Sequence, residues 1–490
     1  MKTQFNKWLV ACFMLLAAFA PYAEAQVRGE VSDEFLGEGT EDDPYLISTA
    51  ADLRKLADDV EKGMTYREEF LQLTNDIVVN EGVLDEEGNL NEDYSEGFEE
   101  WKPIGTEKTH FCGTLDGAHY SIYGLYINHE DETPKGLFAY LSGTVKNLAI
   151  RDAYFCSNST MGSIAGIAET ITINKKDYIP NISYCLNYAT MEAFVYSSNK
   201  NDVNCGGICG YMTDCSLSKC ANWGHISCFR DDSANKYARL GGIIGGYELP
   251  YEGGCPYDVF DCCNFGVVKA RSGGCGGIIG LFYDYDAVGR RGGQRAHFNN
   301  CANHATIHSS SMIGGIGGRI FWGNVDGCVN YGNIECEKEE AEFYGAIFGD
   351  YCSASFIRNC AYLETTCDVF APSLNNTYTG SDAGNNKVMT KKEMKQQSFL
   401  DELNANAKKL GKNYSKWKFG SDGFPTLAWV DEELANGISD ILFTDKAART
   451  VSTKNIHNMN GQLVRSNSVD TDGLPQGIYI VGGKKVIVTK

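Results

Sequence analysis

A seven-residue phrase recurs down the middle of this chain and constrains its fold more than any other feature. It reads Cys, any residue, Asn, an aromatic residue or His, Gly or Ala, any residue, and an apolar residue. The copies begin at Cys185, Cys220, Cys262, Cys301 and Cys328, and a degenerate sixth begins at Cys360, where Tyr362 replaces the Asn. Successive copies are 27 to 42 residues apart. Self-similarity at such a period predicts a stack of similar coils.

Two positions of the phrase are expected to form columns along the stack. The Cys position predicts an inward core column, because unpaired Cys is among the most buried residue types. We expect mostly reduced thiols there, although the spacing of stacked coils also permits disulfides. Zinc is disfavoured, since the chain has no CxxC pair. The Asn position predicts a turn column in which Asn tolerates a left-handed corner and amides bond from coil to coil. Its members are Asn187, Asn222, Asn264, Asn303 and Asn330.

A second phrase, Gly-Gly-apolar-x-Gly, alternates with the first. It begins at Gly206, Gly241, Gly276 and Gly314, with weaker copies from Gly162 and Gly345. Gly permits a sharp corner or a close approach between coils, and the apolar residue can point into the core. Short apolar runs without helical periods between them are typical of buried parallel strands. The two phrases together predict a mainly β fold, a parallel β-helix or solenoid.

The ends of the stack need covering, because an open coil presents unpaired backbone groups. Upstream, a helix is expected to start at Thr49, to bury Leu53, Leu56, Ala57 and Val60, and to stop at Gly63. Downstream, Thr390-Lys391-Lys392-Glu393 is a capping box that opens a second helix. The expected divisions are a signal peptide (1–25), an N-terminal cap with the first coils (26–105), the solenoid repeats (106–370), a C-terminal cap with a helix (371–436) and a small β domain (437–490).

The first 25 residues have the pattern of an export signal: Lys2 and Lys7, an apolar run over 8–20, and small residues before Gln26. A lipoprotein signal is disfavoured, since almost no apolar run precedes Cys12. After signal removal no stretch is long and apolar enough to span a bilayer. The net charge of −21 argues against nucleic acid as a partner, because phosphates demand a basic surface. We therefore expect a protein that is secreted or held at the outer cell surface.

Ordered motifs outside the repeats suggest a family. They include Trp101-Lys102-Pro103-Ile104-Gly105, Gly113-Thr114-Leu115-Asp116-Gly117 and Gly136-Leu137-Phe138. With the Cys-x-Asn repeats they resemble the secreted GLUG-motif proteins of Bacteroidetes, over roughly residues 37 to 430. That resemblance implies a right-handed β-solenoid of the adhesin-like kind, with no agreed catalytic residues. The tail, around Asn458-Met459-Asn460-Gly461 and Leu474-Pro475-Gln476-Gly477, is similar to a type IX (Por) C-terminal sorting domain, which implies contact with secretion machinery.

One insertion stands out chemically. It carries Tyr283, Asp284, Tyr285, Asp286, Arg290, Arg291 and Arg295. Arg can form two parallel hydrogen bonds to a carboxylate or sulfate, and Tyr can stack on a sugar face, so the insertion is a candidate glycan contact. The alternative is a surface loop whose Arg side chains pair with neighbouring Asp. Trp223 and Trp322 are expected to pack at coil corners.

The sequence contains no catalytic motif, and we expect neither a cofactor nor a metal. The leading hypothesis is a non-catalytic adhesin-like protein that binds glycans or host extracellular proteins along the solenoid. A polysaccharide lyase or glycoside hydrolase is the first alternative, because parallel β-helices often carry such sites and Asp284, Asp286, Arg290 and Arg291 have suitable chemistry. A structural component of a surface layer is the second.

Overall fold

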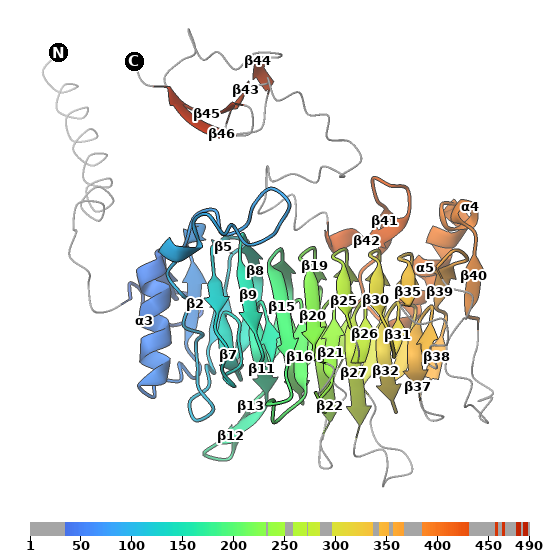
Figure 1. Ribbon diagram of the computed structural model, residues 1–490, viewed down its shortest axis with the longest axis horizontal. Coiled ribbons are helices and arrows are strands. Elements are labelled where there is room, and N and C mark those ends of the chain that lie inside the picture. The colour runs from blue at the N-terminus through green and yellow to red at the C-terminus, as the bar shows by residue number, and fades with distance from the viewer. Residues whose placement is uncertain are drawn as a thin grey trace, which may run out of the picture.

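The computed structural model describes residues 35–231, 234–249, 258–271, 273–284, 296–336, 343–351, 356–366 and 385–430, together with four strands between residues 456 and 488. The expected signal peptide and most of the insertion after Tyr283 lie outside these residues. Most of the described chain forms a stack of coils (Figure 1). Each complete coil passes in turn through four parallel sheets, which we name A, B, C and D in chain order. This arrangement confirms the predicted β-solenoid.

Sheet A holds 18 strands, and in most coils two short strands contribute to it. It comprises β1 (Tyr45–Ile47), β2 (Phe70–Leu73), β3 (Ile77–Val78), β4 (Thr114–Asp116), β5 (Ser121–Tyr123), β8 (Thr144–Arg151), β14 (Asn181–Asn187), β18 (Ser216–Ser218), β19 (Ala221–Asn222), β23 (Asp258–Phe260), β24 (Cys263–Asn264), β28 (His297–Asn299), β29 (Ala302–Asn303), β33 (Asn324–Asp326), β34 (Val329–Asn330), β38 (Phe356–Arg358), β39 (Ala361–Leu363) and β40 (Lys387–Met389).

The other three sheets complete each coil. Sheet B comprises β6 (Tyr126–Asn128), β9 (Tyr154–Ser157), β15 (Thr190–Val195), β20 (Ile226–Arg230), β25 (Val268–Ala270), β30 (Ile307–Ser309) and β35 (Ile334–Cys336). Sheet C comprises β10 (Met161–Gly162), β16 (Val203–Gly206), β21 (Ala238–Gly241), β26 (Gly273–Gly276), β31 (Ile313–Gly314) and β36 (Tyr344–Gly345). Sheet D comprises β7 (Phe138–Leu141), β11 (Ala165–Glu169), β17 (Cys209–Thr213), β22 (Ile244–Leu249), β27 (Ile279–Asp284), β32 (Gly317–Phe321) and β37 (Phe348–Tyr351).

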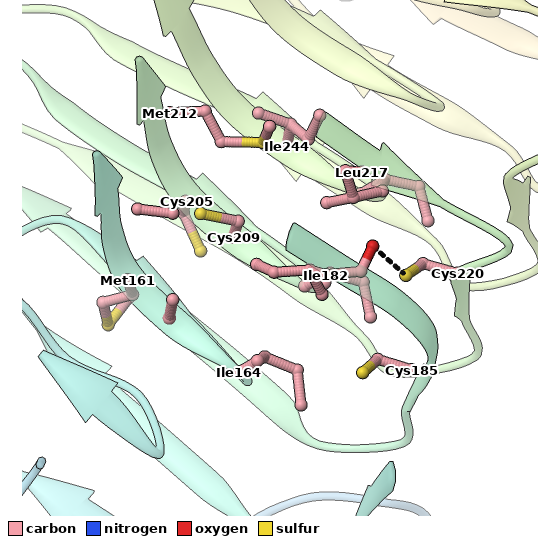
Figure 2. Close-up of a cluster of buried hydrophobic side chains, with 14 of the residues drawn as sticks. Met161, Ile164, Ile182, Cys185, Cys205, Cys209, Met212, Leu217, Cys220 and Ile244 are labelled. Carbon is pink, nitrogen blue, oxygen red and sulfur yellow. Dashed lines mark hydrogen bonds between the residues drawn. The ribbon is translucent and has the colours of Figure 1, made fainter. Parts of the chain in front are cut away.

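The repeat cysteines face a continuous dry core inside the stack. All six of them, from Cys185 to Cys360, are 0% exposed. Figure 2 shows Cys185 and Cys220 among buried Ile, Leu and Met side chains. Each Sγ lies 3.2 to 3.8 Å from the carbonyl oxygen two residues earlier, to which the thiol can donate. Every cysteine among the described residues is a free thiol.

The repeat asparagines form a buried ladder of amides. The Nδ2 of Asn187 donates to the Oδ1 of Asn222 at 2.7 Å, and three further rungs link Asn222, Asn264, Asn303 and Asn330 at 2.8 Å each. The ladder ends where Asn330 donates to the carbonyl of Ala346 at 2.9 Å. All five side chains are 0% exposed. Stacked amides thus bond along the axis in the manner of an Asn ladder in cross-β structures.

The expectation of a left-handed corner at these asparagines is wrong. The left-handed residue is the one before each repeat Cys, with φ between 51° and 69° in all six copies. These residues are Tyr184, Lys219, Asp261, Asn300, Gly327 and Asn359, with φ of 53°, 51°, 58°, 55°, 69° and 51°. The Asn instead turns the chain through its side chain: in four of the five, Oδ1 accepts the backbone N–H two residues later. This local bond replaces a left-handed backbone.

The glycine phrases pack against the asparagine ladder. A Cβ on Gly242 would lie 2.1 Å from the carbonyl oxygen of Gly277 and 2.4 Å from Oδ1 of Asn264. The Ile after each Gly-Gly pair, such as Ile243 and Ile278, is fully buried. Close approach rather than a special φ therefore requires Gly at this corner. The two phrases, which alternate along the sequence, are therefore in contact in the folded coil.

Helices accompany both ends of the stack, as predicted. Helix α3 (Ala50–Glu61) begins with a capping box between Thr49 and Asp52 and buries the four apolar residues expected of it. Figure 1 shows it covering the first coils. Downstream, the expected helix is split into α4 (Lys391–Met394), capped by Thr390 and Glu393, and α5 (Gln397–Leu410). A short 3-10 turn, η1 (Ser95–Gly97), and a hairpin of β12 (Ile171–Ile173) and β13 (Lys176–Tyr178) complete the regular elements near the first coils.

The segment after α4 runs back along the outer side of sheet A (Figure 1). It consists of α5 and a hairpin of β41 (Trp417–Phe419) and β42 (Pro425–Leu427), and we call residues 397–430 the flank segment. Trp417 Nε1 donates to Asn300 Oδ1 at 2.6 Å, and Trp429 Nε1 donates to the carbonyl of Asp261 at 2.9 Å. The part of the chain that was expected to cap the last coil therefore also binds the sides of earlier coils.

Near the C-terminus, four strands form an antiparallel sheet in the order β44-β43-β45-β46. They are β43 (Ile456–Asn458), β44 (Leu463–Arg465), β45 (Gly477–Val481) and β46 (Lys484–Val488). This sheet agrees with the small C-terminal β domain of the predicted fold.

Candidate functional site

The candidate ligand residues fall only partly within the described chain. Tyr283 and Asp284 end strand β27 on sheet D, and the rest of the insertion follows directly from them. Tyr285, Asp286, Arg290, Arg291 and Arg295 lie outside the described residues. The structure thus fixes the point from which the insertion leaves the solenoid. A ligand bound by that insertion would therefore also contact the residues around Tyr283.

Tyr283 belongs to a group of three aromatic rings, which we call the aromatic corner. Phe321, its register partner on β32, has its ring centroid 5.3 Å away. Trp322 follows Phe321 at the corner between sheets D and A, and its ring meets that of Tyr283 edge-on at 5.6 Å. All three side chains are half-buried. Such a cluster offers flat apolar surface next to the polar tips of Tyr and Trp, a combination that suits sugar rings.

An ion pair borders the aromatic corner. The guanidinium carbon of Arg319 lies 4.4 Å from the ring centroid of Phe321, and its Nε is 2.8 Å from a carboxylate oxygen of Asp350. Arg319 and Asp350 are register partners on neighbouring coils. Because the two charges offset each other, the corner has hydrogen-bonding groups without a strong net charge.

Trp322 has an unusual backbone. Its φ is +59°, in the left-handed region that bulky residues rarely adopt. At the equivalent corner of an earlier coil the residue is Asp214, with φ of +49°. Asp tolerates this conformation because its short polar side chain can bond locally, whereas a bulky ring is sterically disfavoured there. A strained residue of this kind persists where the surrounding structure holds it, and such positions cluster at ligand sites.

The two predicted columns lie entirely inside the solenoid. The Cys and Asn columns have no exposed side-chain surface, so they cannot touch a ligand while the solenoid is folded. Burial also raises the pKa of the thiols at Cys262, Cys301, Cys328 and Cys360. They therefore stay protonated near neutral pH. A buried protonated thiol is a poor nucleophile.

Trp223 lies in a second aromatic feature, a ladder formed by the fourth position of the repeat phrase. The ring centroids of Tyr188, Trp223, Phe265, His304 and Tyr331 are 4.6 to 5.0 Å apart in succession. Arg151 covers the ring of Tyr188 at 3.8 Å, and Phe424 of the flank segment covers Tyr331 at 5.0 Å. Burial lowers the pKa of His304 to about 4, so it is neutral at pH 7. The ladder packs the coil corners together, as expected for Trp223.

Sequence reasoning found Tyr283 but not its aromatic neighbours. The signal was present in the glycine phrase: alignment of the copy from Gly276 with the copy from Gly314 places Tyr283 opposite Phe321. Within the described ranges, no group of three or more His, Cys, Asp or Glu could hold a metal ion. The same part of the chain includes no helix that is both long and apolar enough to span a membrane.

The stacked parallel sheets define a β-solenoid, and the aromatic corner is its candidate surface site. Comparisons with known proteins add partial likenesses. Over 149 residues, or 30% of its length, the chain is 31% identical to a "Putative Gly-rich membrane protein" of Evansella cellulosilytica. Over 135 residues, or 27% of its length, it is 33% identical to Halomucin of Haloquadratum walsbyi. The chain spans only 15% and 1% of these two relatives, respectively.

One solved structure is similar over most of the chain. It is a "putative immunoglobulin A1 protease" from Bacteroides ovatus, with 18% sequence identity and a TM-score of 0.45, and the match covers 80% of this chain and 94% of that one. No family model matches the chain.

Proposed function

We propose that this chain is a non-catalytic, adhesin-like binding protein that holds glycans at the aromatic corner. The observation that carries the proposal is the clustering of three half-buried rings at the base of the insertion. Aromatic rings receive the apolar C–H face of a sugar, while Arg319, which is held by the buried Asp350, would donate hydrogen bonds to its hydroxyl groups. The candidate residues Arg290, Arg291 and Arg295 would then reach the same ligand from the insertion.

The proposed location is the outer cell surface or the medium. The export pattern of residues 1–25 supports it, as does the likeness of residues 437–490 to a type IX (Por) sorting domain. The membrane association in the name of the Evansella relative agrees with a surface location. The resemblance to GLUG-motif adhesin-like proteins supports a binding role, and we propose membership of that group on the motifs quoted above.

A glycan array tests the proposal. The mature chain should bind one or more neutral or mixed glycans, and Tyr283→Ala and Trp322→Gly should each lower that affinity at least tenfold. Gly accepts the left-handed backbone of position 322 without strain, so Trp322→Gly should change the free energy of unfolding by only about 1 kcal/mol. The exposed Tyr94 provides a matched control, and Tyr94→Ala should bind normally.

Two results would contradict the proposal. One is a bound glycan whose affinity is unchanged in both aromatic-corner variants while their thermal unfolding stays normal. The other is the release of shortened or unsaturated sugar products during the assay, which would indicate the polysaccharide lyase or glycoside hydrolase alternative.

A further inference from the structure

The aromatic corner continues along the outer face of sheet D. Tyr283 is the register partner of Phe321 on one side and of Glu248, on β22, on the other. The residues that precede Tyr283 and Glu248 in the chain, Phe282 and Tyr247, are 0% exposed. Because side chains alternate along a strand, their neighbours face outward. A row of outward side chains therefore runs along the stack axis, with Glu248 next to Tyr283.

Tyr211, on β17, extends this row by one further coil. Its hydroxyl donates to Oε2 of Glu248 at 3.3 Å. Its register partner is Gly246, and a Cβ there would lie 3.3 Å from Cδ2 of the Tyr211 ring. Because Gly246 has no side chain, the half-buried ring can lean across it toward Tyr283. We call Tyr211, Glu248, Tyr283 and Phe321 the axial track.

Polar groups lie between the rings of the axial track. Nη1 of Arg239, on β21, is 2.6 Å from Oε1 of Glu248, and its Nη2 is 2.9 Å from Oδ2 of Asp202. These three side chains are 19% to 25% exposed. A carboxylate oxygen has two lone pairs, so Glu248 can accept a hydroxyl while it holds Arg239 and Tyr211. The middle of the track thus offers hydrogen bonds, and both of its ends offer rings.

The axial track is longer than one sugar. Its four members belong to four successive coils. Strands of neighbouring coils are about 4.8 Å apart, so the track extends over about 14 Å. A sugar ring is about as long as one such step. About three or four linked sugars would therefore cover the distance from Tyr211 to Phe321.

We propose that the ligand of the aromatic corner is a linear polysaccharide that lies along the axial track, parallel to the stack axis. The rings of Tyr283 and Tyr211 would receive the apolar faces of separate sugars, and Glu248 with Arg239 would bond the hydroxyl groups between them. This inference rests on the proposed function and adds the shape and length of the ligand.

An extended peptide fits the axial track less well. Such a peptide takes its affinity from main-chain hydrogen bonds to an open strand edge. Each of the four strands that carry the track, β17, β22, β27 and β32, is paired on both sides within sheet D. The track therefore offers side chains and no strand edge, which favours a sugar polymer.

Binding of the full mature chain to linear oligosaccharides of two to six sugars tests the inference. The probes are β-1,4-linked glucose, mannose and xylose oligomers and α-1,4-linked glucose oligomers. In at least one series the affinity should rise at least tenfold between the dimer and the tetramer and then level off, because the track ends. Tyr211→Ala should lower the affinity for the hexamer at least fivefold, whereas Tyr211→Phe, which keeps the ring, should retain it.

The exposed Tyr237, in the same coil as Glu248, provides a matched control, and Tyr237→Ala should bind the hexamer normally. The length series uses the unaltered chain, so it tests the inference even if Tyr211→Ala does not fold. Failure of every oligomer to bind, or equal affinities for dimer and hexamer, would overturn the linear ligand. An equal loss in Tyr211→Ala and Tyr237→Ala would do the same, while a loss in Tyr283→Ala would still support the aromatic corner. Hexamer binding that is unchanged in Tyr283→Ala would contradict the proposed function itself, and this inference with it.

Discussion

Asn264 shows how much one side chain of the repeat holds together. Its Nδ2 donates to Asn303 and to the carbonyl of Gly266, and its Oδ1 accepts from Asn222. Asn187, at the start of the ladder, bonds only one neighbouring Asn. A buried amide that loses its partner costs the full desolvation of that group. The interior rungs should therefore matter more than the first one.

We expect Asn264→Ala to lower the free energy of unfolding by about 2 to 4 kcal/mol, because it strands polar groups on both neighbouring coils. Asn187→Ala, the matched change at the end of the ladder, should cost about 1 to 2 kcal/mol. Urea unfolding of the two variants measures the difference. Equal costs would mean that the amides act as independent turn residues rather than as a ladder.

At the scale of the element, the aromatic ladder keeps His304, its fourth member, uncharged near neutral pH. His304 stacks between Phe265 and Tyr331 at 4.6 and 4.7 Å. A neutral imidazole packs there as a flat ring, whereas an imidazolium would lose its hydration. Burial lowers the pKa of His304 to about 4, below the usual value near 6.5. The unfolded chain therefore takes up this proton more readily than the folded chain.

The sign of the pH effect follows from that difference. Stability from His304 is complete above pH 6.5 and falls as the pH drops toward 4, by about 3 kcal/mol in total. His304→Phe, which copies the Phe265 rung, should remove this part of the acid loss. Urea midpoints between pH 7 and pH 4.5 measure it, with the exposed His129→Gln as the control. An undiminished acid loss in His304→Phe would show that other groups cause it.

Elements governed by local chemistry could be predicted, and those governed by distant contacts could not. The capping boxes at Thr49 and Thr390 are visible in four residues each. The left-handed corner was missed because its residue type varies, from Tyr184 to Lys219 to Asp261. The course of the flank segment depends on bonds between residues more than 100 positions apart, for which no pattern in the sequence exists.

The candidate glycan site shows the same division. Tyr283 was anticipated because it opens an unusual insertion, and its contact with Phe321 follows from the register of the glycine phrases. Arg319 and Asp350 belong to no predicted site, and their ion pair arises only when neighbouring coils stack in register.

At the scale of the whole molecule, thiols form an unusual share of the core. Thirteen of the fifteen cysteines in the described chain are buried. Burial raises the pKa of many of them, that of Cys228 to about 12. In the unfolded chain these thiols would ionise near pH 8.5. Their contribution to stability is therefore complete below pH 8.5 and is lost progressively as the pH rises above it.

We expect the urea midpoint to fall steeply between pH 8.5 and pH 10, because each buried thiol whose pKa is raised well above this window costs about 1.4 kcal/mol per pH unit there. The double variant Cys301→Ala/Cys328→Ala should show a shallower dependence, by about two protons in the slope of stability against pH. The wild-type chain at pH 7 provides the reference. An unchanged slope would mean that these two thiols ionise equally readily in the folded protein.

The flank segment affects how the solenoid unfolds. Stacked coils that touch only their neighbours can fray from an end, one after another. Here Trp417 and Trp429 fasten residues near the end of the chain to coils in the middle of the stack. The later coils cannot peel away singly while those indoles remain docked, and so this half of the molecule is bound to melt as a single cooperative block.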